Sequence, residues 1–155
     1  MSADIAAEVC QSLIAELDEL RTAVQHSAEG LTDREFWAKP VEPGNAFGHL
    51  VLHLTGNLNH FVGAQLGGSG YVRDREREFT ESLPPPKLET LAALDDAVAT
   101  FQRVVKNLTA DQLLAQHPHA KFGSVLNTLV HLVAHFALHR GQISYIVRLV
   151  KPPIV

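Results

Sequence analysis

Three histidines stand four residues apart near the end of the sequence, at His131, His135 and His139. In an α-helix, side chains at positions i and i+4 share a face, so this spacing would place three imidazoles in one row. Leaving buried imidazoles without partners would cost about 1–3 kcal/mol for each unsatisfied group, and a bound cation would remove that cost. Imidazole suits zinc, nickel, iron or copper, and three histidines leave an open position for water or substrate. The row therefore predicts a metal site.

A second polar row lies in the apolar segment between residues 46 and 66. It consists of His49, His53, Asn57 and His60, which fall within about one-fifth of a helical wheel at 100° per residue. Leucines and phenylalanines flank both rows, so we expect the rows to face the same interior or its mouth. Spacing alone leaves the ligands open. His131 could replace His139 beside His135, and His49 could replace His53 after a shift of one helical turn.

Two known classes of metal-binding helix are disfavoured. The zincin pattern needs Glu directly after its first histidine, where this sequence has Phe136. Carboxylate-bridged di-iron bundles need Glu three residues before a histidine, and none of the nine histidines has one. No carboxylate falls on either histidine row, so no general base is visible and the catalytic residue is unknown. Glu16 could approach from the first helix, and Arg73 and Asp74 could form part of the mouth.

Four long amphipathic segments can position these rows. Apolar residues recur at three- and four-residue steps over 2–28, 46–66, 89–107 and 123–150. Thr32 and Thr109 predict the caps of two short helical turns, and Asn45 predicts the cap of the second long helix. No strand pattern exceeds a few residues. We predict a single domain over residues 1–155 with an all-α fold, a four-helix bundle.

A connection of about 22 residues joins the second and third predicted helices. It contains the charged run from Arg73 to Glu78 and three prolines, 84–86. Antiparallel neighbours need only short loops, so this long crossover indicates a topology other than up-down-up-down. Because its charges alternate, we favour a solvated crossover over a binding loop.

The composition excludes several function classes. Net charge is −4 with no basic stripe, which argues against a nucleic-acid partner. No apolar run approaches the roughly 20 residues that cross a bilayer, so no membrane partner is expected. Cys10, the single cysteine, cannot form an internal disulfide, which favours a reducing, cytoplasmic setting. We expect Cys10 to be an inert buried thiol.

Several other residues have structural interpretations. Trp37 is expected to close the end of the bundle core, and His117 and His119 are expected to face solvent beside Pro118. Small residues in the last helix could form a self-complementary dimer patch or could face another helix of the same chain. This patch consists of Ala134, Ala137, Gly141 and Ser144, with Val130, Val133 and Arg148.

The sequence resembles the DinB/YfiT-like superfamily of metal-binding four-helix bundles. The resemblance rests on HLVLHLTGNLNHFVG in the second helix and HFALHRGQI in the fourth. DREFWAKP, Asn45 and VRDREREF also match the branch with a His-Leu-x-Gly-Asn-Leu signature. The resemblance implies one metal ligand from the second helix and two from the fourth, namely His53, His135 and His139. Its candidates for residues that support these ligands are His49, Asn57, His131 and Gln142.

The resemblance also implies a function. It indicates a metal-dependent enzyme, similar to thiol S-transferases, in which a divalent transition metal (zinc, nickel or iron) activates a small thiol or water. A low-molecular-weight thiol cofactor, a small-molecule substrate and a homodimer are implied as well. Two alternatives remain. One is a metal-dependent hydrolase, and the other is a non-catalytic, stress-related binding or structural module whose metal joins two helices.

Overall fold

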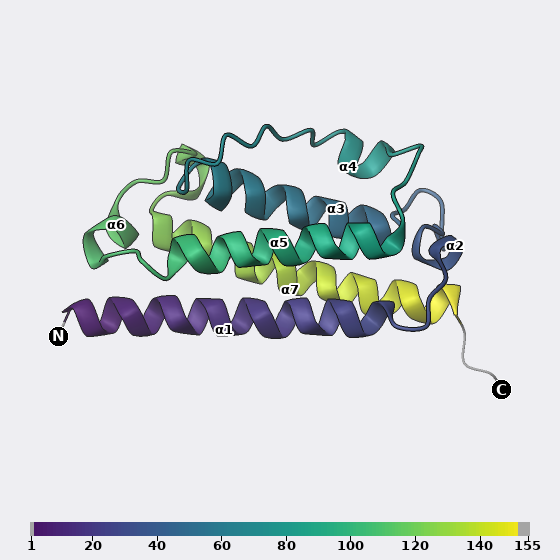
Figure 1. The fold of residues 1–155 in the computed structure, drawn as a ribbon, viewed down its shortest axis with the longest axis horizontal. Coiled ribbons are helices and arrows are strands. Elements are labelled where there is room, and N and C mark those ends of the chain that lie inside the picture. Colours follow the sequence, from purple (N-terminus) through teal and green to yellow (C-terminus); the bar gives the residue numbers. More distant parts are fainter. Residues whose placement is uncertain (1, 152–155) are drawn as a thin grey trace.

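The computed structural model describes residues 2–151, which form an all-α fold without strands, as predicted (Figure 1). The long helical segments are α1 (Ser2–Ala28), α3 (Phe47–Leu58) continued by the π-helix η1 (Asn59–Ala64), α5 (Lys87–Val105) and α7 (Val125–Val150). The short helices are α2 (Asp33–Phe36), α4 (Arg77–Thr80), α6 (Ala110–Leu114) and the 3₁₀ turn η2 (Ala120–Phe122).

The four long segments lie side by side around one apolar core (Figure 1). Helices α1 and α3 each contact both α5 and α7, so the segments close a ring. The largest fully buried apolar side chains come from all four segments and from α2: Leu17, Phe36, Phe47, Leu50, Leu54, Leu58, Leu94, Phe101, Leu129, Phe136 and Ile143. Removing these side chains from water is the main force that holds the segments together.

The crossover between η1 and α5 sets the topology. Helices α3 and α5 run in the same direction, and the intervening chain returns along the outside of α3 before α5 begins (Figure 1). Helix α4 lies within this crossover and contacts α3. The return path therefore brings charged residues of the crossover back over the polar row of α3.

Local sequence signals explain the starts of α2 and α6. Thr32 and Thr109 form the predicted capping boxes of α2 and α6. The prediction that Asn45 caps the second long helix is wrong. Ala46 occupies that position, and its N–H donates to Nδ1 of His49 at 3.1 Å. His49 thus accepts the N–H of the N-cap residue, which is the role of Glu or Gln at the third position of a capping box.

A π-helix interrupts the second predicted long helix. The Gln65 N–H donates to the His60 carbonyl at 3.2 Å, and the Gly67 N–H donates to the Val62 carbonyl at 2.9 Å. These five-residue steps widen the helix, and π-helical turns are frequent at functional sites. The periodicity of 3.6 residues therefore ends at Asn59, which the sequence pattern did not predict.

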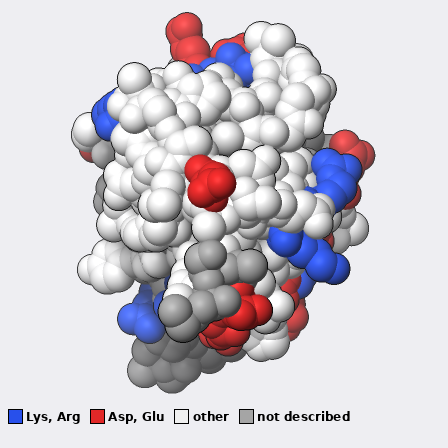
Figure 2. Space-filling view, turned by 90° about the vertical axis from the view of Figure 1, so that its left-hand side faces the viewer, with Lys and Arg blue, Asp and Glu red and all other residues white. Residues whose placement is uncertain are grey.

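Charges of both signs are scattered over the described surface. The end of the molecule that carries the start of α1 is mainly uncharged, with isolated acidic and basic side chains (Figure 2). Within residues 2–151, no helix combines the length and apolar character needed to span a bilayer.

Candidate metal centre

Three histidine rings from two helices converge on one point. His53 comes from the middle of α3, and His135 and His139 lie one turn apart on α7. The Nε2 atom of His135 lies 2.9 Å from Nε2 of His53 and 3.1 Å from Nε2 of His139. All three ligand atoms lie within 4.8 Å of one another. Helices far apart in sequence thus bring three nitrogens close enough to share one cation.

The opposite nitrogens of two rings are held by oxygen atoms. Nδ1 of His53 donates to Oε2 of Glu78 at 2.8 Å, and Nδ1 of His139 donates to Oε1 of Gln142 at 2.7 Å. A carboxylate and a carbonyl oxygen only accept hydrogen bonds, so these two Nδ1 atoms carry the hydrogens. The Nε2 atoms of His53 and His139 therefore direct lone pairs toward the shared point, which is the arrangement that metal-binding histidines adopt.

Two of the three nitrogen–nitrogen separations are close to those around a small divalent metal, and the third is within 4.8 Å. Zinc–nitrogen bonds of about 2.0–2.1 Å in tetrahedral geometry put neighbouring nitrogens about 3.3 Å apart. The observed separations of 2.9 and 3.1 Å are only a few tenths of an ångström shorter. Small side-chain rotations would accommodate the ion, so the donor set fits the group that the resemblance implies.

Glu78 of the crossover is the carboxylate that the sequence analysis missed. Its side chain is buried, and Arg73 donates to both of its oxygens, from Nε at 2.6 Å and from Nη2 at 2.7 Å. Burial alone would raise the pKa of Glu78, but hydrogen bonds from Arg73 and His53 outweigh it and lower the pKa below its usual range. Glu78 is therefore an ionised hydrogen-bond acceptor that orients His53.

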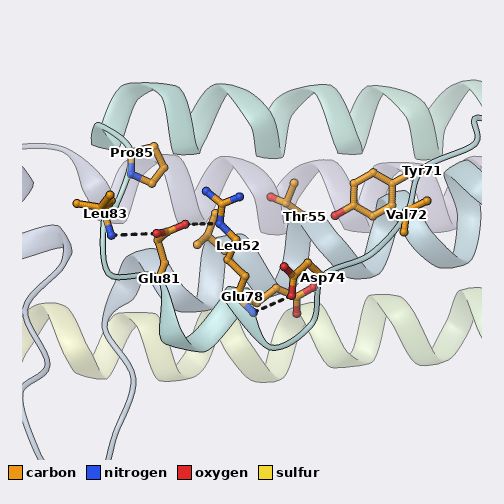
Figure 3. Close-up of a pocket in the computed structure, with 10 residues that line it drawn as sticks. Leu52, Thr55, Tyr71, Val72, Asp74, Glu78, Glu81, Leu83 and Pro85 are labelled. Atoms are coloured by element: carbon orange, nitrogen blue, oxygen red, sulfur yellow. Dashed lines mark hydrogen bonds and ion pairs between the residues drawn. The ribbon is translucent and has the colours of Figure 1, made fainter.

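The favoured interpretation of the crossover as merely solvated is wrong for Arg73 and Glu78. Arg73 reaches the mouth of the site as expected, whereas Glu16 is exposed on α1. Asp74 has a local role, since its Oδ1 accepts from the Arg77 N–H at 3.1 Å at the start of α4 (Figure 3). The alternating charges from Arg73 to Glu78 do not indicate, from sequence alone, which side chains point inward.

Local hydrogen bonds stabilise the end of α4 and the turn that follows it. Glu81 accepts hydrogen bonds from Nε of Arg77 at 2.5 Å and from the Leu83 N–H at 2.9 Å (Figure 3). Glu78 also lines a pocket of about 370 Å³ between the crossover and α3 (Figure 3). The Phe79 ring packs against the His53 ring, with the two centroids 4.9 Å apart.

Gly56 makes room for the carboxylate. It lies on α3 one turn from His53, and a Cβ there would overlap Oε1 of Glu78 and lie 2.9 Å from its Cδ. Asn57 follows, and its Nδ2 donates to the His53 carbonyl at 2.9 Å and lies 3.0 Å from Nε2 of His53. Arg73 donates to Oδ1 of Asn57 at 3.2 Å, which fixes the orientation of the amide.

The environment keeps the α7 ligands neutral. Burial, followed by the charges of His139 and His53, lowers the pKa of His135 to about 4. Burial also lowers the pKa of His139. Both imidazoles therefore offer lone pairs rather than protons near neutral pH.

The other predicted supporting residues have different surroundings. Of the four candidates, Asn57 and Gln142 contact a ligand ring by hydrogen bonds. His131 is exposed, and its ring stacks on His135 with centroids 5.8 Å apart. His49 lies one turn before His53 and caps α3, with its ring 5.5 Å from Trp37. The alternative register with His49 as ligand therefore has no counterpart in this geometry.

The loop before α7 is more buried than predicted. His117 is 1% exposed, so the prediction that it faces solvent is wrong. Its Nε2 lies 3.0 Å from the Phe61 carbonyl, and its Nδ1 accepts from the His119 N–H at 3.0 Å. His119 is half-buried beside Phe61, with ring centroids 5.4 Å apart. These contacts dock the loop against η1.

A family model for mycothiol-S-transferases matches residues 12–150. The chain belongs to the mycothiol-S-transferase family. This family lies within the DinB/YfiT-like superfamily, so the resemblance drawn from the sequence is confirmed. No curated protein gives a significant match.

In this member of the mycothiol-S-transferase family, two of the three convergent histidines, His53 and His135, line an open pocket of about 650 Å³. Four parts of the chain line it: α3 with η1, the crossover, the η2 turn and α7. The lining residues include His53, His135, Phe61, Arg75, Lys121 and Phe122. A small molecule in this pocket would lie directly beside the convergent nitrogens.

Proposed function

We propose that the chain is a metal-dependent thiol S-transferase whose metal is held by His53, His135 and His139. The observation that carries the proposal is the convergence of three Nε2 atoms, supported by Glu78 and Gln142 on the opposite nitrogens. Membership of the mycothiol-S-transferase family supports mycothiol, or another low-molecular-weight thiol, as the sulfur donor. The nitrogen donor set suits zinc, nickel or iron.

A divalent cation in this site would stabilise a thiolate and so make a small thiol nucleophilic near neutral pH. The chain's own residues determine the geometry around it. Glu78 and Gln142 hold two imidazoles in the tautomer that offers Nε2, and Arg73 balances the charge of Glu78. Asn57 places an amide at the edge of the site, within reach of a group bound beside His53.

The geometry leaves the thiol proton to solvent. Glu78 has a lowered pKa and both of its oxygens accept hydrogen bonds, so it is a poor proton acceptor. The open side of the site, where His135 and His139 are only half-buried, gives water access. In the overall transfer, the S–H bond breaks and a sulfur–carbon bond forms on the electrophile. The leaving group then departs with its electron pair.

The test is thiol-dependent conjugation by the purified, metal-loaded protein. Mycothiol and 1-chloro-2,4-dinitrobenzene serve as substrates, and product absorbance is followed. We expect turnover that His139→Ala abolishes together with bound metal, whereas His26→Ala leaves it unchanged, because His26 is exposed on α1. Equal turnover in His139→Ala, or no turnover with any small thiol, would refute the proposal.

The same preparation separates the competing functions. A hydrolase would cleave an activated ester without added thiol, again dependent on His139. A structural metal would join α3 to α7, so chelation would lower the melting temperature while no thiol-dependent or hydrolytic turnover is found. Metal content measured before and after His53→Ala and His135→Ala identifies both the ion and its ligands.

The assembly belongs to the same proposal: one four-helix-bundle domain that forms a homodimer through the small-residue face of α7. The alternative, that this face packs inside its own chain, is wrong for Ala134, Ala137 and Gly141, which are exposed. Apolar side chains beside them are exposed as well, with Leu138 at 58% and Tyr145 at 65%. Light scattering of wild type and Ala137→Glu tests the dimer, and a wild-type monomer would refute it.

A further inference from the structure

We infer that the pocket lined by His53 and His135 binds a small anionic molecule with a flat apolar body, with its anionic group on Arg75 and Lys121. That this molecule is the electrophile of the transfer rests on the proposed function, whereas the binding site itself does not. The inference draws on the charge of the lining, on its row of aromatic rings and on the place of the cations at its rim.

The charge of the lining is uniformly positive. Arg73, Arg75 and Lys121 line the pocket, and no Asp or Glu does. Glu78 balances the charge of Arg73 from behind. Within residues 2–151, neither Arg75 nor Lys121 forms an ion pair, and both are exposed at the rim. Like charges on one concave surface focus the electric field and attract an anion.

One wall of the pocket is a row of neighbouring aromatic and imidazole rings. The Phe122 ring lies 5.3 Å from His119 and 4.7 Å from His131, with interplanar angles of 34° and 32°. The His131 ring in turn stacks on His135 at 15°. Phe61 meets Phe122 edge-on at 5.1 Å. This wall suits a planar, unsaturated body, which would gain both burial and favourable ring contacts.

The two features give the ligand a direction. His53 and His135 mark the inner end of the pocket, and the exposed side chains of Arg75 and Lys121 mark its rim. A carboxylate at the rim would leave the far end of a flat molecule against the convergent nitrogens. The fitting class is therefore an aryl or conjugated carboxylate whose reactive carbon lies away from the carboxylate.

Binding of cinnamate and its neutral analogue cinnamamide to the zinc-loaded protein tests the inference by calorimetry. Wild type should prefer cinnamate by about tenfold. Arg75→Gln and Lys121→Gln should each reduce that preference about two- to fivefold, as expected for one exposed charge pair. Arg34→Gln removes the same charge from an exposed site on α2, outside this pocket, and should leave the preference unchanged.

The metal-free protein provides the decisive control, because a carboxylate could bind the metal instead. The inference requires that metal removal preserves the preference and that the two rim variants reduce it. The inference would be overturned if the preference for cinnamate disappears on metal removal and is unchanged in Arg75→Gln and Lys121→Gln. Equal or undetectable binding of cinnamate and cinnamamide would also overturn it. A retained preference without any thiol transfer would refute the proposed function while leaving this binding site intact.

Discussion

The substitution Gly56→Ala tests whether Glu78 must pack against α3 for His53 to be oriented. Gly56 lies inside a helix, where Ala normally stabilises by about 0.5–1 kcal/mol. Here the added Cβ would overlap Oε1 of Glu78 and lie 3.3 Å from Nε of Arg73. Steric expulsion of the carboxylate and helix propensity therefore act in opposite directions, and their magnitudes decide the sign.

The steric displacement of Glu78 should outweigh the gain in helix propensity. Overpacking a filled site costs about 1–3 kcal/mol. Leaving Nδ1 of His53 without its acceptor adds about 1–3 kcal/mol. After subtraction of the helix gain, the metal-free protein should lose about 1–5.5 kcal/mol of unfolding free energy. Metal affinity should fall about 10- to 100-fold, because the partner that orients a ligand is lost.

The assays are urea unfolding in the presence of a chelator and competition for zinc against a chromophoric chelator. Gly141→Ala is the matched control, since it is also a helical glycine but a Cβ there would meet no atom within 4 Å. It should leave zinc affinity unchanged, and it should stabilise slightly when both variants are compared in the same oligomeric state, because Gly141 lies on the face proposed for the dimer. If Gly56→Ala behaves like Gly141→Ala in both assays, Glu78 does not orient His53 as argued.

Three further predictions concern the same network. Glu78→Gln keeps an acceptor but removes the charge, so zinc affinity should fall about tenfold with the fold retained; unchanged affinity in the zinc competition assay would contradict this. Gln142→Ala removes the acceptor of the His139 Nδ1 hydrogen and should weaken zinc binding less than Glu78→Gln, because Gln142 is exposed. The zinc competition assay measures this, and a larger loss of zinc affinity than in Glu78→Gln would contradict the prediction. The metal-free protein should lose about 1–2 kcal/mol of stability as pH falls from 6.5 toward 4, after allowance for the half-exposed ring. The pKa of His135 is lower in the folded protein than in the unfolded chain, so the unfolded chain binds the proton first as pH falls. An unfolding free energy that stays constant between pH 6.5 and 4 would contradict this prediction.

Periodicity predicted the helical class, and spacing predicted that histidines of two helices would share polar rows, because both depend on short-range geometry. A spacing of four residues places His135 and His139 on one helical face in any sequence context. Choosing His53 over His49 required the family resemblance, because both lie on the same face of α3. The structure separates them through a local contact, since His49 is used to cap the helix. Such a cap competes with metal binding and is hard to see from spacing.

Glu78 could not be identified from its neighbours in the sequence. It lies in a run of alternating charges, and which of them turns inward depends on how the crossover folds back over α3. The sequence does contain an indication of this contact at Gly56, on the α3 side. Gly56 in the middle of an otherwise strong helix costs helix stability, and such a glycine usually permits a close approach. Its partner, however, becomes visible only in three dimensions.

The His-Leu-x-Gly-Asn-Leu signature therefore has a physical meaning beyond a single ligand. His53 supplies the nitrogen, Gly56 supplies the space for a carboxylate, and Asn57 supplies an amide that joins the ligand to Arg73. Because Arg73 and Glu78 both come from the crossover, displacing that segment would remove the orienting acceptor of His53 and part of the cationic pocket wall at once. The proposed metal-binding and substrate-binding sides of the site would then fail together, which is the expected behaviour if the crossover is part of the functional site rather than a connection.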